Sequence, residues 1–390
     1  MGMQVRQFEN YQQLPETYAP LLEETRRQGL FADAEWLELL MVHFYDKDHV
    51  MRVYTVEDAA TGEPLMLLPA RYTRSDAVVS GALTIAAVGH MENYATIAMV
   101  FAPSAVADRR AILAVLFQWL REKKAPPLTP RADTIRLWPF EVGSALGVDV
   151  REALRDVGFV VQPYTNSYNQ YELTAGVSFE EYFSRRSANQ RYSSRRRRRN
   201  LEKLGELEFV MVTGSESREE LARAIDDYVL VAVRSWKAPN STVSADILDF
   251  IWLAASRGCL RLGVLRLDGR AIAAQFWTFT AGVASAIRPN FDERFKRESP
   301  GVVLSNFCIE YLLDTDCADA LDFGYGGDEY KEKWMKGSRY YCGFMAFNPA
   351  TPLGLSYGLL HIIGQSFKRA LKWLLGKPPG LAKSGGRPPG

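Results

Sequence analysis

Two short segments in the second half of the chain carry residue types that could do chemistry. The first, Arg297-Glu-Ser-Pro-Gly-Val-Val303, follows a predicted strand and opens a predicted helix. Ser299 fits the N-cap, Pro300 fits the first helical position, and Gly301 lets a ligand approach the backbone. Free amides at the positive end of the helix dipole would then hold a pyrophosphate, with Arg297 as counter-charge. Ordinary helix capping explains the same residues, and the local pattern favours it.

The second segment is Leu321-Asp-Phe-Gly-Tyr-Gly-Gly-Asp-Glu-Tyr-Lys331, in which an apolar strand runs into glycines and a polar helix start. Asp322 and Glu329 can accept a proton and Tyr330 can donate one. Acyl transfer from a thioester to an amine needs both roles. A purely structural turn, with Tyr330 packed on the sheet, fits the pattern equally well.

Elements must position these segments, and the apolar periodicity predicts them in a similar order in both halves. The first half is predicted to hold helices over 15–27, 35–44, 107–123 and 151–158, and strands over 50–56, 64–70, 82–88 and 134–139. The second half is predicted to hold helices over 179–204, 218–236, 246–258, 299–313 and 328–336, and strands over 209–212, 260–267, 271–279, 283–290, 320–324 and 339–347. This order predicts an α/β fold with a mixed sheet covered by helices, and it suggests a duplicated domain.

The bulk composition restricts the class of protein. A chain of 390 residues is long enough for two domains, and its formal net charge of +1 does not call for a nucleic acid or an acidic membrane as main partner. Four cysteines in no Cys-x-x-Cys pair and four scattered histidines predict a reducing cytoplasm and no structural metal. The N-terminus lacks the layout of a secretory signal, and no stretch of eighteen apolar residues is present.

Taken together, the segments resemble the CelD/BioF2-like acetyltransferase domain, a family of the GCN5-related N-acetyltransferase (GNAT) superfamily. The resemblance extends upstream to the basic helix from Phe183-Ser-Arg-Arg-Ser187 to Asn200-Leu-Glu-Lys-Leu-Gly205, and to Arg234-Ser-Trp236. It covers residues 165–347 well and the first half loosely. The chain is similar, more distantly, to the FemAB peptidoglycan aminoacyltransferases, which carry two such domains in tandem.

The resemblance implies a splayed, mixed sheet of the GNAT type, flanked by helices, in two tandem GNAT-like domains. These would be a degenerate N-terminal domain at 1–162 and an acyltransferase domain at 163–349, followed by a basic helix and disordered tail at 350–390. It also implies an acyl donor, acetyl-CoA or another acyl-CoA, in the gap of the sheet. The residues implied to hold it are Arg297, Ser299, Gly301, Val302 and Val303, and Val303 stands where the family has a small residue.

The same resemblance implies roles around the second segment. Tyr330 falls where many superfamily members place the tyrosine that protonates the leaving thiolate, and Asp322 or Glu329 would deprotonate the acceptor. The residues expected to contact the acceptor are Trp236, Gly324, Gly326 and Lys331. No metal is implied.

A run of five arginines, Arg195–Arg199, is the most conspicuous charge cluster. On a helix these side chains point around most of the circumference, and no interleaved aromatic residues mark a platform for single-stranded nucleic acid. The pattern favours a solvated helix face over an anionic acceptor or acyl carrier, and both over nucleic acid.

The tail 357–375 has Leu360, Ile363, Phe367, Leu371 and Leu374 on one helical face and basic or polar residues on the other. It would either lie on an anionic membrane, with Trp373 at the interface, or dock on the protein's own surface. Beyond Gly376 the Pro- and Gly-rich end is predicted to be disordered.

The sequence as a whole therefore predicts an acyltransferase acting on an amine or hydroxyl of a small molecule, a saccharide or a cell-envelope precursor. It would work in the cytoplasm, either free or on the inner face of the membrane. One alternative is a transferase that uses aminoacyl-tRNA and contacts the RNA through the arginine helix. Another is a non-catalytic double domain that binds an envelope precursor. The acceptor and the oligomeric state stay open.

Overall fold

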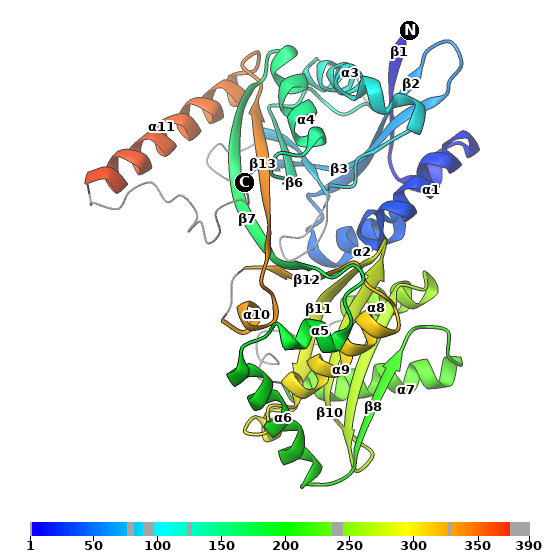
Figure 1. The fold of residues 1–390 in the computed structure, drawn as a ribbon. Helices are drawn as coiled ribbons and strands as arrows, with labels where there is room; N and C mark the ends of the chain where they lie inside the picture. The colour runs from blue at the N-terminus through cyan, green and yellow to red at the C-terminus, as the bar shows by residue number, and fades with distance from the viewer. Residues whose placement is uncertain are drawn as a thin grey trace.

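The computed structural model describes residues 2–75, 82–88, 97–122, 127–235, 245–326 and 329–374. Within them thirteen strands form one mixed sheet with helices on both faces, which confirms the predicted α/β fold (Figure 1). The order along the sheet is β1-β2-β3-β4-β6-β13-β7-β12-β11-β10-β9-β8, with β5 paired to β3.

The first half contributes the strands β1 Met3–Phe8, β2 Val50–Asp58, β3 Pro64–Ser75, β4 Ala82–Ala87, β5 Val100–Phe101 and β6 Thr134–Glu141. Its helices are α1 Ala19–Gln28, α2 Ala34–Phe44, α3 Arg109–Arg121 and α4 Ala145–Asp156. The second half contributes the strands β8 Leu207–Val212, β9 Leu260–Leu267, β10 Arg270–Thr280, β11 Val283–Phe291 and β12 Ala320–Tyr325. Its helices are α5 Phe179–Ser184, α6 Ala188–Glu202, α7 Arg218–Val233, α8 Ala245–Ser256, α9 Pro300–Asp314 and α10 Glu329–Trp334.

Two long strands, β7 (Val160–Leu173) and β13 (Ser338–Phe347), join the halves at the centre of the sheet. β7 ends the element series of the first half but pairs with β12, while β13 ends the series of the second half but pairs with β6. β7, the last strand of the first half, therefore lies beside β12 of the second half. β13, the last strand of the second half, lies beside β6 of the first half. The parallel pairs β4/β6 and β11/β12 also correspond, which confirms the predicted duplication.

The exchange makes the sheet continuous from one half to the other. The domain boundary predicted after residue 162 falls inside β7, which pairs with β13 along most of its length. Figure 1 shows both strands running from the upper half of the molecule into the lower half. The centre of the sheet is thus built from paired residues that lie 168 to 187 positions apart in the sequence.

The parallel strands β11 and β12 separate after a short contact. β11 pairs with β12 through Val283–Ser285 and Ala320–Asp322, yet β11 continues to Phe291. A bulge at Ile287 also shifts the register of β11 against β10, because Phe276 pairs with Arg288 while Trp277 pairs with Ala286. The sheet therefore opens beyond Asp322, as the GNAT-type splay predicts.

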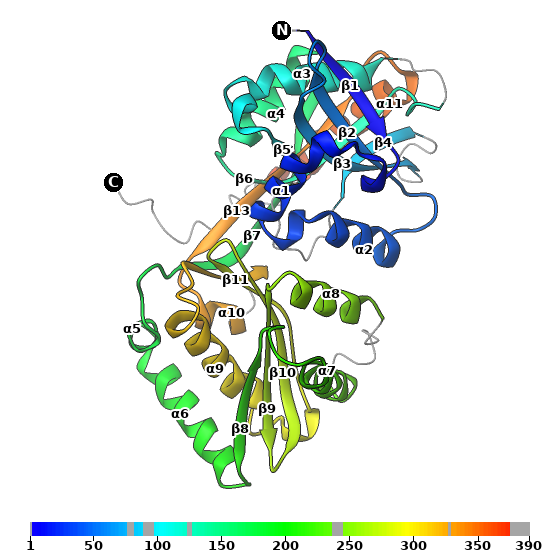
Figure 2. The ribbon, with the colours of Figure 1, turned by 90° about the vertical axis from the view of Figure 1, so that its right-hand side faces the viewer.

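Helices α2 and α8 lie side by side where the halves meet on one face of the sheet (Figure 2). The rings of Trp36 and Phe250 lie 4.4 Å apart between centroids. The buried carboxylate of Asp33, which caps α2, accepts a hydrogen bond from Arg257 Nε at 3.0 Å. Apolar packing and a partly buried ion pair thus stabilise this contact in addition to the shared sheet.

Two predictions about elements were wrong. The single helix predicted over 179–204 is two helices, α5 and α6, because the chain turns at Arg186 and Ser187 caps a new helix by accepting from Gln190 N. β1 and β7 were not predicted at all. β7 mixes polar, aromatic and proline residues, and it forms a strand because it is enclosed between β13 and β12.

The last helix, α11 (Pro352–Leu374), packs on β13 only near its beginning. Tyr357 is buried against Phe347, and His361 Nδ1 is hydrogen-bonded to Gln162 Oε1 at 3.0 Å. Leu360 and Ile363, on the predicted apolar face, are 48% and 62% exposed. Among the residues that the structure describes, no helix has the length and apolar character needed to cross a membrane.

Candidate active site

Asp322 lies on β12 at the last residue pair before β11 and β12 separate. Its side chain is only 2% exposed, and it accepts hydrogen bonds from Asn169 Nδ2 at 3.0 Å and from Gly324 N at 2.7 Å. Burial raises the pKa of this carboxyl to about 6, although both hydrogen bonds favour the charged form. Asp322 is therefore a carboxylate whose pKa lies close to that of a general base.

The neighbours of Asp322 come from the two exchanged strands. Tyr171 on β7 lies directly opposite Asp322, and Arg339 Cζ on β13 lies 3.8 Å from the centroid of the Tyr171 ring. Tyr341, also on β13, is buried, and its pKa is raised by burial and by the charge of Asp322. A buried carboxylate, an amide, two phenols and a guanidinium thus come together where the halves meet.

The sequence did not single out Asn169, Tyr171, Arg339 or Tyr341. The mixture of polar and aromatic residues in Ser167-Tyr-Asn-Gln-Tyr171, which does not alternate strictly, was the local signal for a strand. It is weak, because a polar face on a buried strand resembles a loop. Their approach to Asp322 depends on the strand exchange, which local periodicity does not reveal.

Tyr330 on α10 belongs to a separate hydrogen-bond network. Its hydroxyl lies 2.8 Å from Ser305 Oγ, which donates to the Gly301 carbonyl at 2.9 Å and accepts from Gln275 Nε2 at 2.8 Å. Since Ser305 uses its only hydrogen on Gly301, Tyr330 must be the donor to Ser305. Trp277 Nε1 donates to Gln275 Oε1 at 3.0 Å and completes the chain.

Asp322 and Tyr330 lie on opposite faces of β12. Leu321 and Phe323, which alternate with Asp322 along the strand, pack into the core with α9, and the Phe323 ring lies 6.4 Å from that of Tyr330. The proposed base and acid would therefore reach a reacting group from two sides, where the sheet opens. The side chain of Glu329, the other predicted base, and all of Trp236 lie outside the described residues.

The predicted pyrophosphate segment does begin α9, and Ser299 is at the predicted N-cap position, although its side chain does not cap the helix. Ser299 occupies the N-cap position in the left-handed region, at φ 57°, and its side chain makes no capping bond. A serine caps from an extended backbone, which directs its oxygen at the next amides. Pro300 is the first helical residue, as predicted. Arg297 is exposed in the turn before it.

The other residues expected to hold the donor differ in their surroundings. An added Cβ at Gly301 would lie 3.5 Å from Phe291, an ordinary contact distance, and the Gly301 carbonyl is occupied by Gln275 and Ser305. Val302 is half-buried, whereas Val303 is buried in the core below α6.

The residues expected to contact the acceptor are used partly within the protein. Gly324 and Gly326 have φ of 73° and 91°, so the glycines do allow the bend that ends β12. The amide of Gly324 is occupied by Asp322, and that of Gly326 donates to the Tyr168 carbonyl at 3.0 Å. Lys331 Nζ donates to the Tyr325 carbonyl at 2.6 Å. These bonds fix the loop that follows Asp322.

Two further findings concern the surroundings. In the described part of the chain, no group of three or more His, Cys, Asp or Glu residues could hold a metal ion. A cavity of about 640 Å³ is present between α6 and α9, and neither Asp322 nor Tyr330 lines it.

Comparisons with known proteins agree with this architecture. Residues 188–332 match the family model of the acetyltransferase (GNAT) domain. The crystal structure of FemX is similar with a TM-score of 0.55 at 12% identity, over 92% of this chain and 99% of that one. L-PGS from Bacillus licheniformis has a TM-score of 0.47 at 12% identity, over 91% and 98% of the two chains. No curated protein sequence matches significantly.

A third solved structure is a tandem GNAT protein from the clavulanic acid biosynthesis pathway, with a TM-score of 0.46 at 10% identity, over 89% of this chain and 99% of that one. The family match lies in the half that contains Asp322, and the similarity to FemX extends over both halves. The internal repeat of strands and helices is independent of both observations. Residues 188–332 therefore match a GNAT-type acetyltransferase domain, and the whole chain, built from two similar halves, has a fold like that of FemX.

Proposed function

We propose that this chain transfers an acyl group from acyl-CoA to an amine or hydroxyl of a small molecule, a saccharide or a cell-envelope precursor. The observation that carries the proposal is Asp322, a buried carboxylate with a raised pKa at the point where β11 and β12 separate. The GNAT-type domain supports acyl transfer as the reaction class. Acetyl-CoA is the simplest donor to test.

In the proposed reaction the acceptor N–H or O–H gives its proton to Asp322 as its N or O atom attacks the thioester carbonyl. The carbon–sulfur bond then breaks, and the thiolate takes a proton from Tyr330. The bulge at Ile287 places a backbone amide of β11 out of register with β10. This amide is our candidate for polarising the carbonyl of the thioester. Atoms and charge balance over a turnover when the proton that Asp322 takes up is released to solvent and Tyr330 takes one back from solvent.

For the donor, we propose that α9 receives the pyrophosphate at its first turn, with Arg297 as an exposed counter-charge. Arg297→Gln should then raise the KM for acyl-CoA with little change in kcat. An equal loss with every donor, including short acyl thioesters without a pyrophosphate, would contradict this placement.

The experiment that tests the function is an assay of free thiol released from acetyl-CoA in the presence of candidate amines, saccharides and envelope precursors. Asp322→Asn should lower kcat by about a hundredfold or more, the usual contribution of a positioned base. Asp319→Asn makes the same change at an exposed carboxylate three residues away and serves as control. An unchanged rate in Asp322→Asn would remove Asp322 from the mechanism.

Transfer from aminoacyl-tRNA is the second candidate. It is favoured by the similarity in fold to FemX over the whole chain and by the exposed Arg196 and Arg199 on α6. If it holds, the chain should bind tRNA in a salt-sensitive way, and reversing the charge of Arg195–Arg199 should abolish that binding. Failure to bind acyl-CoA of any chain length would shift the choice to this candidate or to a non-catalytic binding protein.

A further inference from the structure

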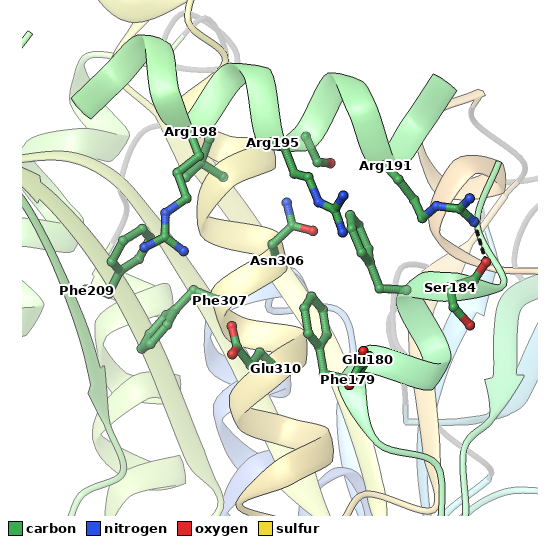
Figure 3. Close-up of a pocket in the computed structure, with 13 residues that line it drawn as sticks. Phe179, Glu180, Ser184, Arg191, Arg195, Arg198, Phe209, Asn306, Phe307 and Glu310 are labelled. Atoms are coloured by element: carbon green, nitrogen blue, oxygen red, sulfur yellow. Dashed lines mark hydrogen bonds between the residues drawn. The ribbon is translucent and has the colours of Figure 1, made fainter. Parts of the chain in front are cut away.

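The cavity of about 640 Å³ between α6 and α9 has a lining unlike that of the candidate active site. Three arginines of α6, Arg191, Arg195 and Arg198, face it at the spacing that places side chains on one side of a helix (Figure 3). Phenylalanines and two carboxylates, Glu180 and Glu310, complete it. It therefore combines strong hydrogen-bond donors, flat apolar surfaces and acceptors.

The three arginines differ in how they are occupied. Arg191 Nη1 donates to the carbonyls of Ser184 and Arg186, at 2.5 and 2.7 Å, and Arg198 Nε donates to Glu202 at 2.9 Å. Arg195 lies between them on the helix and is exposed. Across the described residues it forms no ion pair, and its nearest aromatic contact is the Phe183 ring at 6.0 Å. Arg195 is thus an available guanidinium held between two anchored ones.

Two buried polar atoms of the lining also lack partners. Ser194 is only 4% exposed, and within the described part of the chain neither its Oγ nor Asn306 Oδ1 has a hydrogen-bond partner. Asn306 Nδ2 donates to the Val302 carbonyl at 3.0 Å, which fixes the amide, and Figure 3 shows this side chain directed toward α6. Buried polar groups are nearly always satisfied in folded proteins, so these two point to a ligand.

Two pairs of phenylalanine rings lie on either side of Asn306. The rings of Phe209 and Phe307 lie 5.0 Å apart between centroids, and Arg198 Cζ lies 5.4 Å from the Phe209 ring. The rings of Phe179 and Phe183 are stacked at 5.4 Å. Such faces accept a planar ring by stacking.

We infer that this cavity binds a nucleoside phosphate. The phosphate would accept hydrogen bonds from Arg195, the base would stack on the phenylalanines, and its amino group would donate to Asn306 Oδ1 or Glu310. A simple inorganic anion makes no use of the rings, and it has no donor group for the two carboxylates. An acyl chain leaves those carboxylates and the two buried acceptors without partners. The inference rests on the lining alone and does not depend on the proposed acyl transfer.

The test is calorimetry of the full chain with two probes, adenosine 3′,5′-bisphosphate and inorganic pyrophosphate. We expect saturable binding of the nucleotide and at least tenfold weaker binding of pyrophosphate. Arg195→Gln should weaken nucleotide binding about tenfold or more, as expected for hydrogen bonds to a charged group. Arg196→Gln removes the same charge from a neighbouring exposed position that does not line the cavity, and it should change the affinity less than twofold.

Phe307→Leu distinguishes the contribution of the base from that of the phosphate. It should weaken binding of the nucleotide severalfold and leave binding of pyrophosphate unchanged. The inference is overturned if pyrophosphate binds as tightly as the nucleotide, if Arg195→Gln and Arg196→Gln act equally, or if the nucleotide shows no saturable binding at millimolar concentration. Nucleotide binding that is unchanged in Arg297→Gln, the variant expected to weaken acyl-CoA binding, would show that the two sites are separate.

Discussion

Asp322 has a pKa of about 6 because burial disfavours its charge. A general base must be deprotonated, so we expect kcat/KM for the acceptor to rise with slope one as the pH increases to about 6 and then to level off. The measurement is a pH profile of kcat/KM between pH 4.5 and 8, with acetyl-CoA saturating. The residual activity of Asp322→Asn should lack this rising limb, and a rising limb that persists in the variant would assign it to another group.

The same pKa predicts an effect on stability that an exposed aspartate would not show. The folded value lies above the value of about 3.9 in an unfolded chain, so folding takes up a proton between these values and stability falls as the pH rises from about 4 to 6. Asp322→Asn should therefore gain stability relative to the natural chain, by about 1–3 kcal/mol at pH 8 and less at pH 4.5. Urea unfolding at both pH values measures this difference, and a larger gain at the lower pH would contradict it.

When Tyr330 donates its hydrogen to Ser305, it can protonate a thiolate only after its hydroxyl rotates. Burial raises its pKa, which keeps the hydroxyl protonated. We expect Tyr330→Phe to lower kcat about tenfold or more with unchanged affinity for CoA. Ser305→Ala releases the hydroxyl and should lower kcat less than Tyr330→Phe does. An unchanged rate in Tyr330→Phe would exclude Tyr330 from the mechanism.

At the scale of elements, α10 is held by a buried ion pair that connects three parts of the chain. The guanidinium of Arg186 pairs with Glu172 on β7 and donates from Nη1 to the Trp334 carbonyl at the end of α10. Glu172 Oε2 also accepts from Lys336 N at 3.0 Å. The turn between α5 and α6 therefore sets the position of the helix that carries Tyr330.

Removing one partner of this pair leaves the other buried without a counter-charge. We expect Arg186→Met to destabilise the fold by about 3–5 kcal/mol, and the double variant with Glu172→Leu to recover part of that loss. Chemical denaturation of the three variants measures both effects. Arg185→Met, one residue away on an exposed side chain, is the matched control and should change stability by less than about 1 kcal/mol. A double variant less stable than Arg186→Met would contradict the pairing.

Some elements and site residues of this protein could be predicted from the sequence, and others could not. Hairpins such as β9 and β10, with Asp268-Gly269 at the turn, and helices with a clear apolar stripe were predicted within a few residues, because their patterns are local. The sequence singled out Asp322 and Tyr330 as candidate site residues because they lie near and just after the end of one strand. Asn169 and Arg339 were not found, because only pairing across β7 and β13 brings them to Asp322. Local patterns do not encode which distant strand lies beside a given one.

At the scale of the whole molecule, the exchange of β7 and β13 makes the first half part of the candidate site. Tyr171 and Arg339 belong to strands whose other ends pack in the first half. The first half therefore acts as more than a neighbouring domain, since it fixes the strands that surround Asp322. The acceptor would be bound where these two strands cross from one half into the other.

The last helix, α11, is the element for which we predict contact with a membrane surface. α11 docks through Tyr357 and His361, and Leu360 and Ile363, the two residues of its predicted apolar face whose side chains the structure describes, are exposed. The sequence adds Lys368, Arg369 and Lys372 without acidic residues. Of the two alternatives for this helix, an anionic membrane surface is the one that would cover the exposed apolar face.

We therefore expect the chain to bind vesicles that contain phosphatidylglycerol more tightly than vesicles of phosphatidylcholine alone, in a salt-sensitive way. Leu360→Glu with Ile363→Glu should weaken that binding at least tenfold, because each buried side chain contributes about 1.5–3 kcal/mol. Leu173→Glu changes an apolar residue at the end of β7 that is even more exposed, and it is the control. Co-sedimentation measures all three, and equal binding of the double variant and the control would mean that α11 does not meet the membrane.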